Sequence, residues 1–279
     1  MNFDKEEAQL LFTVDKFFGT TKGVPYKEIV KVEIAEDGSE TRRTIRSPNE
    51  DLPNVMHELQ RLELALCGGT ITSIFTNTTV NDLDFYMINP QRRKEVEAFF
   101  EKYFTKEYSS VNAITYVRKS PKSNKKWRIQ LITKFTGNPY DIFEWFDFTI
   151  THGAYRFDVK QFEFGDRFFQ DISKRRLVYS GNSQYPICAM YRTKKYVARG
   201  YDLPGATIMH IALCIIQLKI ESYAELKAQL MGIDTMYLQK LLEAKDPNAP
   251  VNYGEFVHEA FQVIDHIGST MAELEDEDD

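Results

Sequence analysis

The sequence contains few cysteines and no motif that would make them reactive. Three cysteines occur in 279 residues, at positions 67, 188 and 214, and no two of them form a Cys-x-x-Cys pair. An odd number of widely spaced cysteines is typical of a reducing compartment, where thiols fill the protein core. We therefore expect no disulfide framework, and we interpret Cys67 as a packing residue.

The sequence also lacks a long apolar run and an apolar leader. Its most apolar stretch, residues 206–218, contains His210 and is shorter than the ~20 residues that a membrane span needs. The first residues show no basic start followed by an apolar core. These absences predict a soluble, cytoplasmic protein with no membrane partner.

An excess of charge of one sign is absent from most of the chain. Six of the 41 acidic residues lie among the last seven positions, so the rest of the chain balances its 35 basic residues. This balance argues against tight, sequence-independent binding of long duplexes. We expect residues 271–279 to form a disordered acidic tail. The motifs G-x-S-x-G, H-E-x-x-H and Walker A are missing too, which argues against the enzyme classes that they mark.

What is present is a stretch, residues 66–88, that needs a chemical explanation. Asp82 and Asp84 alternate with apolar residues, which predicts a strand with both carboxylates on one face and their Cα atoms roughly 6.5–7 Å apart. Such carboxylates repel each other unless a cation lies between them. Mg²⁺ is usually bound by one or two carboxylates together with phosphates. The Gly68-Gly69 turn has no Cβ atoms, so its backbone can approach a phosphate closely.

The order of these features resembles the signature of the DNA polymerase β-like nucleotidyltransferase superfamily. An apolar-flanked Gly68-Gly69 is followed by Ser73 and then by the Asp82-x-Asp84 strand, with twelve residues between Gly69 and Asp82. The resemblance implies that the two aspartates ligate two Mg²⁺ ions. It also implies that Gly68, Gly69 and Ser73 contact the phosphates of a nucleoside triphosphate. The superfamily usually has Ser directly after the first Gly, and Gly69 stands there in this sequence.

The same resemblance implies a third acidic ligand on a neighbouring strand, for which Asp147 is the best candidate. Asp147 and Thr149 alternate with apolar residues over 146–151, which predicts a strand. A predicted strand over 127–135 and a short helix precede it. We therefore expect Asp147 in the same sheet as the Asp-x-Asp strand.

Strand patterns end near residue 160, and helical patterns follow. We expect an α+β fold, with a mixed nucleotidyltransferase-type sheet flanked by helices over 1–160 and an all-α domain over 161–270. Residues 186–200 place Arg192 and Lys195 on one helix face. Their Arg-x-x-Lys-Tyr order resembles helices of phage-borne nucleotidyltransferase-like proteins. We expect this face to bind the triphosphate; the alternative is a solvated cationic surface.

The remaining patterns predict helices and hairpins around this centre. A hairpin is expected over 28–46, and a second one over 111–118 and 127–135. The loop of the second hairpin is either solvated or an electrostatic guide for nucleic acid or triphosphate, since it is rich in lysine: Lys119, Lys122, Lys125 and Lys126. His152 is interpreted as a polar residue at a strand end. Helices are expected at 2–18, 49–62 and 90–104 and, in the second half, near 166–174, 186–200, 205–219, 222–231, 234–244 and 253–270.

Together these features predict a Mg²⁺-dependent nucleotidyltransferase. It would move a nucleoside monophosphate from a triphosphate such as ATP to the hydroxyl of an acceptor, RNA or protein for example, and release pyrophosphate. Two alternatives remain open. One is a non-catalytic nucleotide-binding or scaffold protein of the same fold, and the other is a metal-dependent nuclease that uses the same carboxylates. The sequence does not reveal the nucleotide, the acceptor or the oligomeric state.

Overall fold

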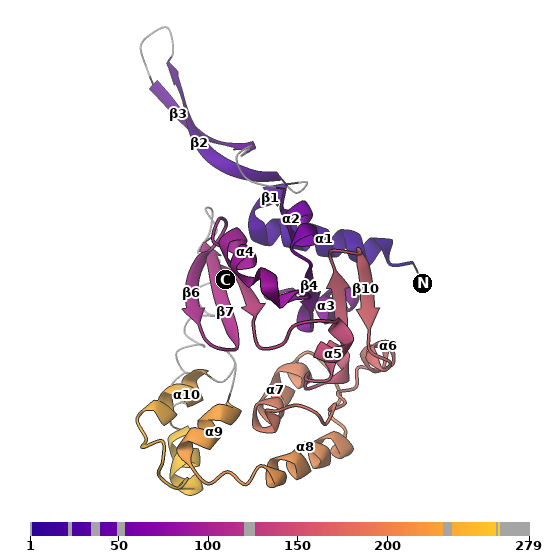
Figure 1. Ribbon diagram of the computed structural model, residues 1–279, viewed down its shortest axis with the longest axis vertical. Helices are drawn as coiled ribbons and strands as arrows, with labels where there is room; N and C mark the ends of the chain where they lie inside the picture. The colour runs from indigo at the N-terminus through magenta and orange to yellow at the C-terminus, as the bar shows by residue number, and fades with distance from the viewer. Residues whose placement is uncertain are drawn as a thin grey trace. The chain divides into compact units, whose positions relative to one another are not determined.

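The structure is a computed structural model of the 279-residue chain (Figure 1). It describes residues 2–21, 24–34, 40–48, 54–119, 126–230, 236–260 and 262. The chain divides into two compact units. Unit 1 consists of Met1–Phe146 and Ile150–Ile172, and unit 2 consists of Asp147–Thr149 and Ser173–Asp279.

Unit 1 is built on a seven-stranded sheet with the strand order β10-β9-β4-β5-β8-β7-β6. The pair β5 and β8 is parallel, and the other neighbours are antiparallel, so the sheet is mixed. Residues that pair in register on adjacent strands lie on the same face of the sheet. The strands are β4 (Leu64–Cys67), β5 (Asp82–Met87), β6 (Thr105–Ser109), β7 (Ala113–Lys119), β8 (Lys126–Ile132), β9 (Gly153–Arg156) and β10 (Gln161–Phe164).

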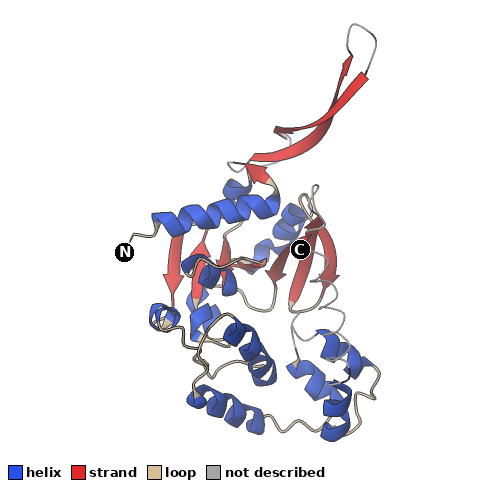
Figure 2. Ribbon diagram, turned by 180° about the vertical axis from the view of Figure 1, so that it is seen from behind, coloured by secondary structure: helices blue, strands red, loops and turns tan. Residues whose placement is uncertain are grey.

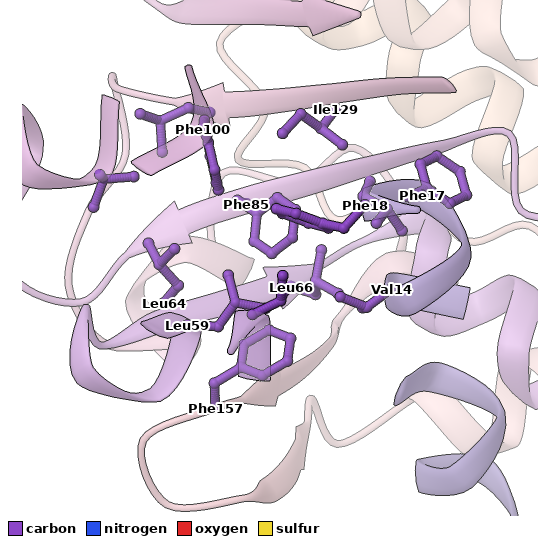
Figure 3. Packing of buried hydrophobic residues seen from close by; sticks show 14 of the residues in the cluster. Val14, Phe17, Phe18, Leu59, Leu64, Leu66, Phe85, Phe100, Ile129 and Phe157 are labelled. Atoms are coloured by element: carbon purple, nitrogen blue, oxygen red, sulfur yellow. The ribbon is translucent and has the colours of Figure 1, made fainter. Parts of the chain in front are cut away.

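One face of this sheet carries the main core of unit 1. Phe18 of α1, Phe85 of β5 and Phe100 of α4 meet there, with ring centroids 6.2 Å and 5.1 Å apart along the series (Figure 3). On the opposite face, Phe143 of α5 and Cys67 belong to a second cluster of buried residues, and Cys67 is fully buried, as expected for a packing residue. The helices of unit 1 are α1 (Asp4–Phe18), α2 (Val55–Arg61), α3 (Gly69–Phe75), α4 (Arg93–Phe100), α5 (Pro139–Phe143) and α6 (Phe168–Ser173), with 3-10 turns η1 (Pro90–Arg92) and η2 (Thr149–Thr151).

The hairpin predicted over 28–46 is confirmed. Strands β1 (Thr20–Thr21), β2 (Val24–Ile34) and β3 (Glu40–Pro48) form a separate antiparallel sheet, in which β2 and β3 make a two-stranded ribbon (Figures 1 and 2). The helix predicted over 49–62 begins at Val55, because the side chain of Asn54 accepts a hydrogen bond from the backbone N–H of His57 and caps it. Residues 49–53 lie outside the described ranges.

In its described residues unit 2 is mainly helical, as the sequence predicts (Figure 2). The helix α9 begins with a capping box, in which the Ser222 hydroxyl accepts from the N–H of Glu225 and the Glu225 carboxylate accepts from that of Ser222. No helix in the described ranges is long and apolar enough to cross a membrane. The helices are α7 (Pro186–Ala198), α8 (Gly205–Gln217), α9 (Tyr223–Gln229) and α10 (Met236–Glu243), and residues 253–260 are helical too. The predicted α+β class, a mixed sheet with helices followed by a helical region, is confirmed.

Two strands of the seven-stranded sheet were not predicted. β6 is exposed along its whole length, so it carries no apolar alternation, and it is defined by its pairing with β7 at the sheet edge. β10 begins at Gln161, where strand patterns were expected to end, and it pairs with β9. β10 has only four residues, which is too short for a period-two pattern to be distinctive.

The strand predicted over 146–151 is wrong. Asp147 lies in a bend, Phe148 forms an isolated bridge with Tyr179, and Thr149–Thr151 is a 3-10 turn. The apolar residues of this segment alternate because the chain crosses from one unit to the other. Phe148 packs against aromatic rings of unit 2, whereas Phe146 packs against Tyr86 and Phe143 of unit 1. Packing in two different units therefore produced a pattern that resembles a strand.

Candidate functional site

The Gly68-Gly69 turn connects β4 to α3. Gly68 has φ +81° and ψ −137°, a conformation that residues with a Cβ rarely adopt. Its N–H donates to the carbonyl of Gly153 at 2.9 Å, and its carbonyl accepts from the N–H of Ile71 at 3.1 Å. A Cβ placed on Gly69 would meet no atom within 4 Å. The turn therefore fixes the backbone at Gly68 and leaves open space at Gly69.

Asp82 and Asp84 lie on β5, on the face opposite the core, and both are partly exposed. Within the described part of the chain, the Asp82 carboxylate has no hydrogen bond or ion pair. The Thr70 hydroxyl, in the first turn of α3, donates to the backbone carbonyl of Asp82 at 3.1 Å. Unit 1 therefore brings the glycine turn and the carboxylate pair together. Thr70 was not singled out in the sequence, because nothing local indicates its bond to a residue twelve positions away.

The strand next to the carboxylates is β8, which runs parallel to β5. Asp82 pairs in register with Arg128, and Asp84 pairs with Gln130. Arg128 lies 3.7 Å from the Glu107 carboxylate, and its Nε is buried without a hydrogen-bond partner. At the two positions beside the aspartates, the neighbouring strand thus supplies a guanidinium and an amide.

A divalent cation fits the pair of aspartates only together with further ligands. The described residues contain no cluster of three His, Cys, Asp or Glu side chains arranged to hold a metal. Two carboxylates that share a sheet face match the way Mg²⁺ is bound with phosphates and water, since a dedicated cage of protein ligands is unusual for that ion. The residues of unit 1 are therefore suited to a Mg²⁺–phosphate complex.

Asp147 belongs to unit 2 and is engaged there. Its side chain is buried, and it accepts hydrogen bonds from the Ser183 hydroxyl at 2.6 Å and from Nη1 of Arg192 at 2.5 Å. The backbone N–H of Ser180 donates to the Asp147 carbonyl at 2.9 Å. Lys195 lies exposed on α7, one turn beyond Arg192. Asp147 and Arg192 therefore form an ion pair. From the sequence, Asp147 was assigned to a metal and Arg192 to a triphosphate. Both of these assignments stay predictions.

Ser73 and the flank of the lysine-rich loop are two further parts of the predicted site. Ser73 is 4% exposed in the middle of α3, so its hydroxyl is covered from solvent. Arg118, at the edge of the lysine-rich loop, donates to the carbonyls of Phe17 at 2.9 Å and Lys16 at 3.1 Å, which ties β7 to the end of α1. Two lysines of that loop, at positions 122 and 125, lie outside the described residues.

His152 is part of the packing behind the glycine turn. Its ring stacks on Phe143 at 5.6 Å and lies edge-on to Phe146 at 6.2 Å. Burial lowers the pKa of His152 to about 4, so the ring is neutral at neutral pH. The ring of Phe146 is also 3.6 Å from the position that a Cβ on Gly68 would occupy. His152 directly precedes β9, at a strand end as expected, and its ring packs behind the glycine turn.

Comparisons with known proteins found a family model and a relative that are similar to this chain in sequence. Residues 42–175 match the model of the Gabija anti-defense 2 family (Gad2), and this range includes the turn and all three aspartates. The chain is 31% identical over 191 residues to "Gabija anti-defense 2" of Bacillus phage SPbetaL7. The alignment covers 68% of this chain and 46% of that relative, so the chain spans less than half the length of the curated relative it matches.

Among the solved structures that align with this chain are a tRNA-processing enzyme and a CCA-adding enzyme. A tRNA-processing enzyme in its apo form aligns with a TM-score of 0.46 and 14% identity, over 83% of this chain and 68% of the other. The Thermotoga maritima CCA-adding enzyme complexed with tRNA aligns with a TM-score of 0.46 and 15% identity, over 70% of this chain and 48% of the other. In sequence, the region that holds the glycine turn and the paired aspartates matches the Gad2 family model, and the chain as a whole is similar to a phage anti-defense protein.

Proposed function

We propose that the chain is a Mg²⁺-dependent nucleotidyltransferase that transfers a nucleoside monophosphate from a nucleoside triphosphate to an acceptor hydroxyl. One observation carries the proposal: the glycine turn and the two carboxylates are joined by the hydrogen bond from Thr70 to the Asp82 carbonyl. A backbone that can approach phosphates therefore lies beside a pair of oxygen ligands for Mg²⁺. The acceptor, RNA or protein for example, is not identified by these residues.

In this proposal each residue of unit 1 has a defined task. Asp82 and Asp84 hold Mg²⁺, which when bound neutralises phosphate charge and lowers the pKa of the acceptor hydroxyl. Gly68 and Gly69 admit the phosphates beside β5, and Thr70 fixes the spacing between the turn and the strand. Phosphoryl transfer depends mostly on positioning and electrostatics, so a nucleophilic side chain is not required. The proposal also includes the two Mg²⁺ ions that the superfamily resemblance implies. It keeps Asp147 as a metal ligand, and it keeps three residues as contacts of the triphosphate: Ser73, Arg192 and Lys195.

Ligand-dependent stability tests this function without knowledge of the acceptor. Thermal unfolding is measured for the wild type and for an Asp82→Asn/Asp84→Asn variant with each nucleoside triphosphate, with and without Mg²⁺. A ligand at a hundred times its dissociation constant adds about 2.7 kcal/mol to the free energy of unfolding. We expect this gain only with Mg²⁺ and only when both aspartates are present. Asp166→Asn, a change at an exposed carboxylate of unit 1, is the control and should behave as the wild type.

If no triphosphate raises the unfolding temperature of the wild type, the transferase proposal fails and the scaffold hypothesis is favoured. If the double variant gains as much stability as the wild type, a triphosphate binds but the carboxylates do not hold the metal. Cleavage of an oligonucleotide without added triphosphate would instead favour the nuclease hypothesis.

The similarity to a named relative supports a second proposal, at the level of the organism. We propose that the chain is a Gad2 family member that counteracts Gabija defence, as the name of its 31% identical relative states for that protein. The test is the plating efficiency of a Gabija-sensitive phage on cells that carry Gabija, with and without this chain. Restored plating is the expected result. Plating that stays low while the chain accumulates in soluble form would overturn the proposal.

A further inference from the structure

Arg128 stands beside the aspartates of the proposed site without pairing with them. It occupies the position on β8 that is in register with Asp82 on β5. Neighbouring strands of a sheet lie about 4.7–4.9 Å apart, so the two side chains are within reach of an arginine–carboxylate ion pair. No such pair within 4 Å joins the side chains of Asp82 and Arg128, both of which are described.

The other contacts of Arg128 leave its donors largely unused. Its one ion-pair contact in the described residues is with Glu107 at 3.7 Å, longer than the 2.7–2.9 Å of a charge-assisted hydrogen bond. Glu107 is shared with Lys126, which lies 3.5 Å away. The Nε of Arg128 is buried and has no hydrogen-bond acceptor. A buried donor without a partner is destabilising, so a ligand that accepts from this guanidinium would relieve that cost.

We propose that Arg128 binds a phosphate group whose Mg²⁺ counterion is held by Asp82 and Asp84. A guanidinium presents forked donors that match phosphate oxygens. A bare phosphate would be repelled by the neighbouring carboxylates, whereas a Mg²⁺–phosphate complex presents a cation to the aspartates and oxygens to Arg128. One ligand thus explains why Asp82 and Arg128 occupy adjacent positions without forming an ion pair. This inference rests on the proposed function and adds a binding residue to it.

The phosphate group that Arg128 binds has two possible sources. One is the triphosphate of the donor, and the other is the phosphodiester of a nucleic-acid acceptor. Calorimetric titration distinguishes them at fixed ionic strength with Mg²⁺ present. One arm uses inorganic triphosphate, and the other uses a short single-stranded oligonucleotide with no terminal phosphate. The proteins are the full chain as wild type, Arg128→Gln, Arg128→Lys and the control Arg93→Gln. Arg93 is an exposed residue of α4 that pairs with Glu97.

We expect Arg128→Gln to weaken binding of one of the two ligands by at least about tenfold. Arg128→Lys should lose less, because it keeps the charge but not the fork, and Arg93→Gln should bind as the wild type does. Weaker triphosphate binding assigns Arg128 to the donor, and weaker oligonucleotide binding assigns it to the acceptor. If Arg128→Gln does not fold, an Arg128→Lys protein that folds and binds both ligands like the wild type overturns the inference.

The failure of this inference can be separated from failure of the proposed function. Suppose that the wild type binds Mg²⁺–triphosphate and the Asp82→Asn/Asp84→Asn variant does not, while folded Arg128→Gln binds both ligands like the wild type. The nucleotidyltransferase proposal then stands, and the role of Arg128 is wrong. If the wild type binds neither ligand, both proposals are overturned together.

Discussion

Gln130 of β8 is the register partner of Asp84 of β5, so its amide stands at the position where a neighbouring strand would present a third ligand. An amide coordinates a cation only through its carbonyl oxygen and contributes no negative charge. Among the described residues of unit 1, the sheet therefore presents two carboxylates beside each other, and an amide takes the third place.

Replacement of Gln130 by Glu should strengthen Mg²⁺ binding. A third carboxylate beside Asp84 adds Coulomb attraction to the ion, and we expect the Mg²⁺ affinity in the presence of triphosphate to rise at least about tenfold, or ~1.4 kcal/mol. Isothermal titration with Mg²⁺ measures this change. When the same substitution is made in an Asp84→Asn variant, the Mg²⁺ affinity should rise by less than it does in the wild type. Unchanged or weaker affinity in a folded Gln130→Glu protein would show that this position does not face the ion.

The two glycines of the turn should respond differently to substitution. Gly68→Ala forces a side chain into a backbone conformation with φ +81°, and we expect a loss of about 1–3 kcal/mol in the free energy of unfolding. Gly69→Ser places its Cβ in open space and should change that value by less than about 0.5 kcal/mol. Urea unfolding of both variants gives the comparison. Equal costs at the two positions would contradict the geometry of the turn.

Local patterns predicted much of unit 1. The period-two alternation around Asp82 and Asp84 correctly predicted β5, and the helix predicted from residue 90 does begin there, as the 3-10 turn η1 whose N-cap is Asn89. These features depend on residues within a few positions of each other, so the sequence carries the whole signal. The same holds for the glycine turn, where a conformation with positive φ requires a residue without a Cβ.

Local sequence patterns could not predict which residues surround Asp82 and Asp84. Arg128 and Gln130 lie beside them because β8 pairs with β5 across more than forty residues, and strand order and register of that kind are set by the packing of the whole sheet. Asp147 was assigned to a strand because apolar residues alternate around it, although its neighbours Phe146 and Phe148 pack in two different units. Alternation reports burial on both sides of a chain and does not show what buries each side.

The ion pair of Asp147 with Arg192 leads to a prediction for unit 2. Removal of one partner leaves the other charge poorly compensated, since Asp147 is buried. Because the Arg192 side chain is 31% exposed, we expect a coupling energy of about 1–2 kcal/mol, below that of a fully buried pair. A double-mutant cycle of Asp147→Asn and Arg192→Gln, followed by urea unfolding without Mg²⁺, measures it.

A coupling near zero would show that the two side chains do not depend on each other. If Mg²⁺ alone stabilised the wild type and not Asp147→Asn, the carboxylate would be acting as a metal ligand and the ion pair would be secondary. Asp82→Asn serves as the comparison. Because the Asp82 carboxylate has no partner in the described residues, that change should have little effect on stability without metal.

The buried ring of His152 should make the stability of unit 1 depend on pH. The pKa of His152 is lowered from 6.5 to about 4 in the folded chain, so below pH 6.5 the unfolded state binds a proton more readily than the folded state does. The contribution of His152 is therefore fully present above pH 6.5 and is lost as the pH falls toward 4. By linkage, the loss at pH 5 is about 2 kcal/mol relative to pH 7.

Substitution of His152 by Phe isolates this contribution, because the new ring is of similar size, can stack on Phe143 and cannot take up a proton. Other groups also titrate between pH 7 and 5, so the quantity to compare is the change in the free energy of unfolding for the wild type minus that for the variant, from urea unfolding at each pH. We expect the wild type to lose about 2 kcal/mol more than His152→Phe. An equal loss of stability in the wild type and in His152→Phe would mean that His152 is protonated as easily in the folded chain as in the unfolded one. The buried Nε2 and the flanking rings of Phe143 and Phe146 argue against that outcome.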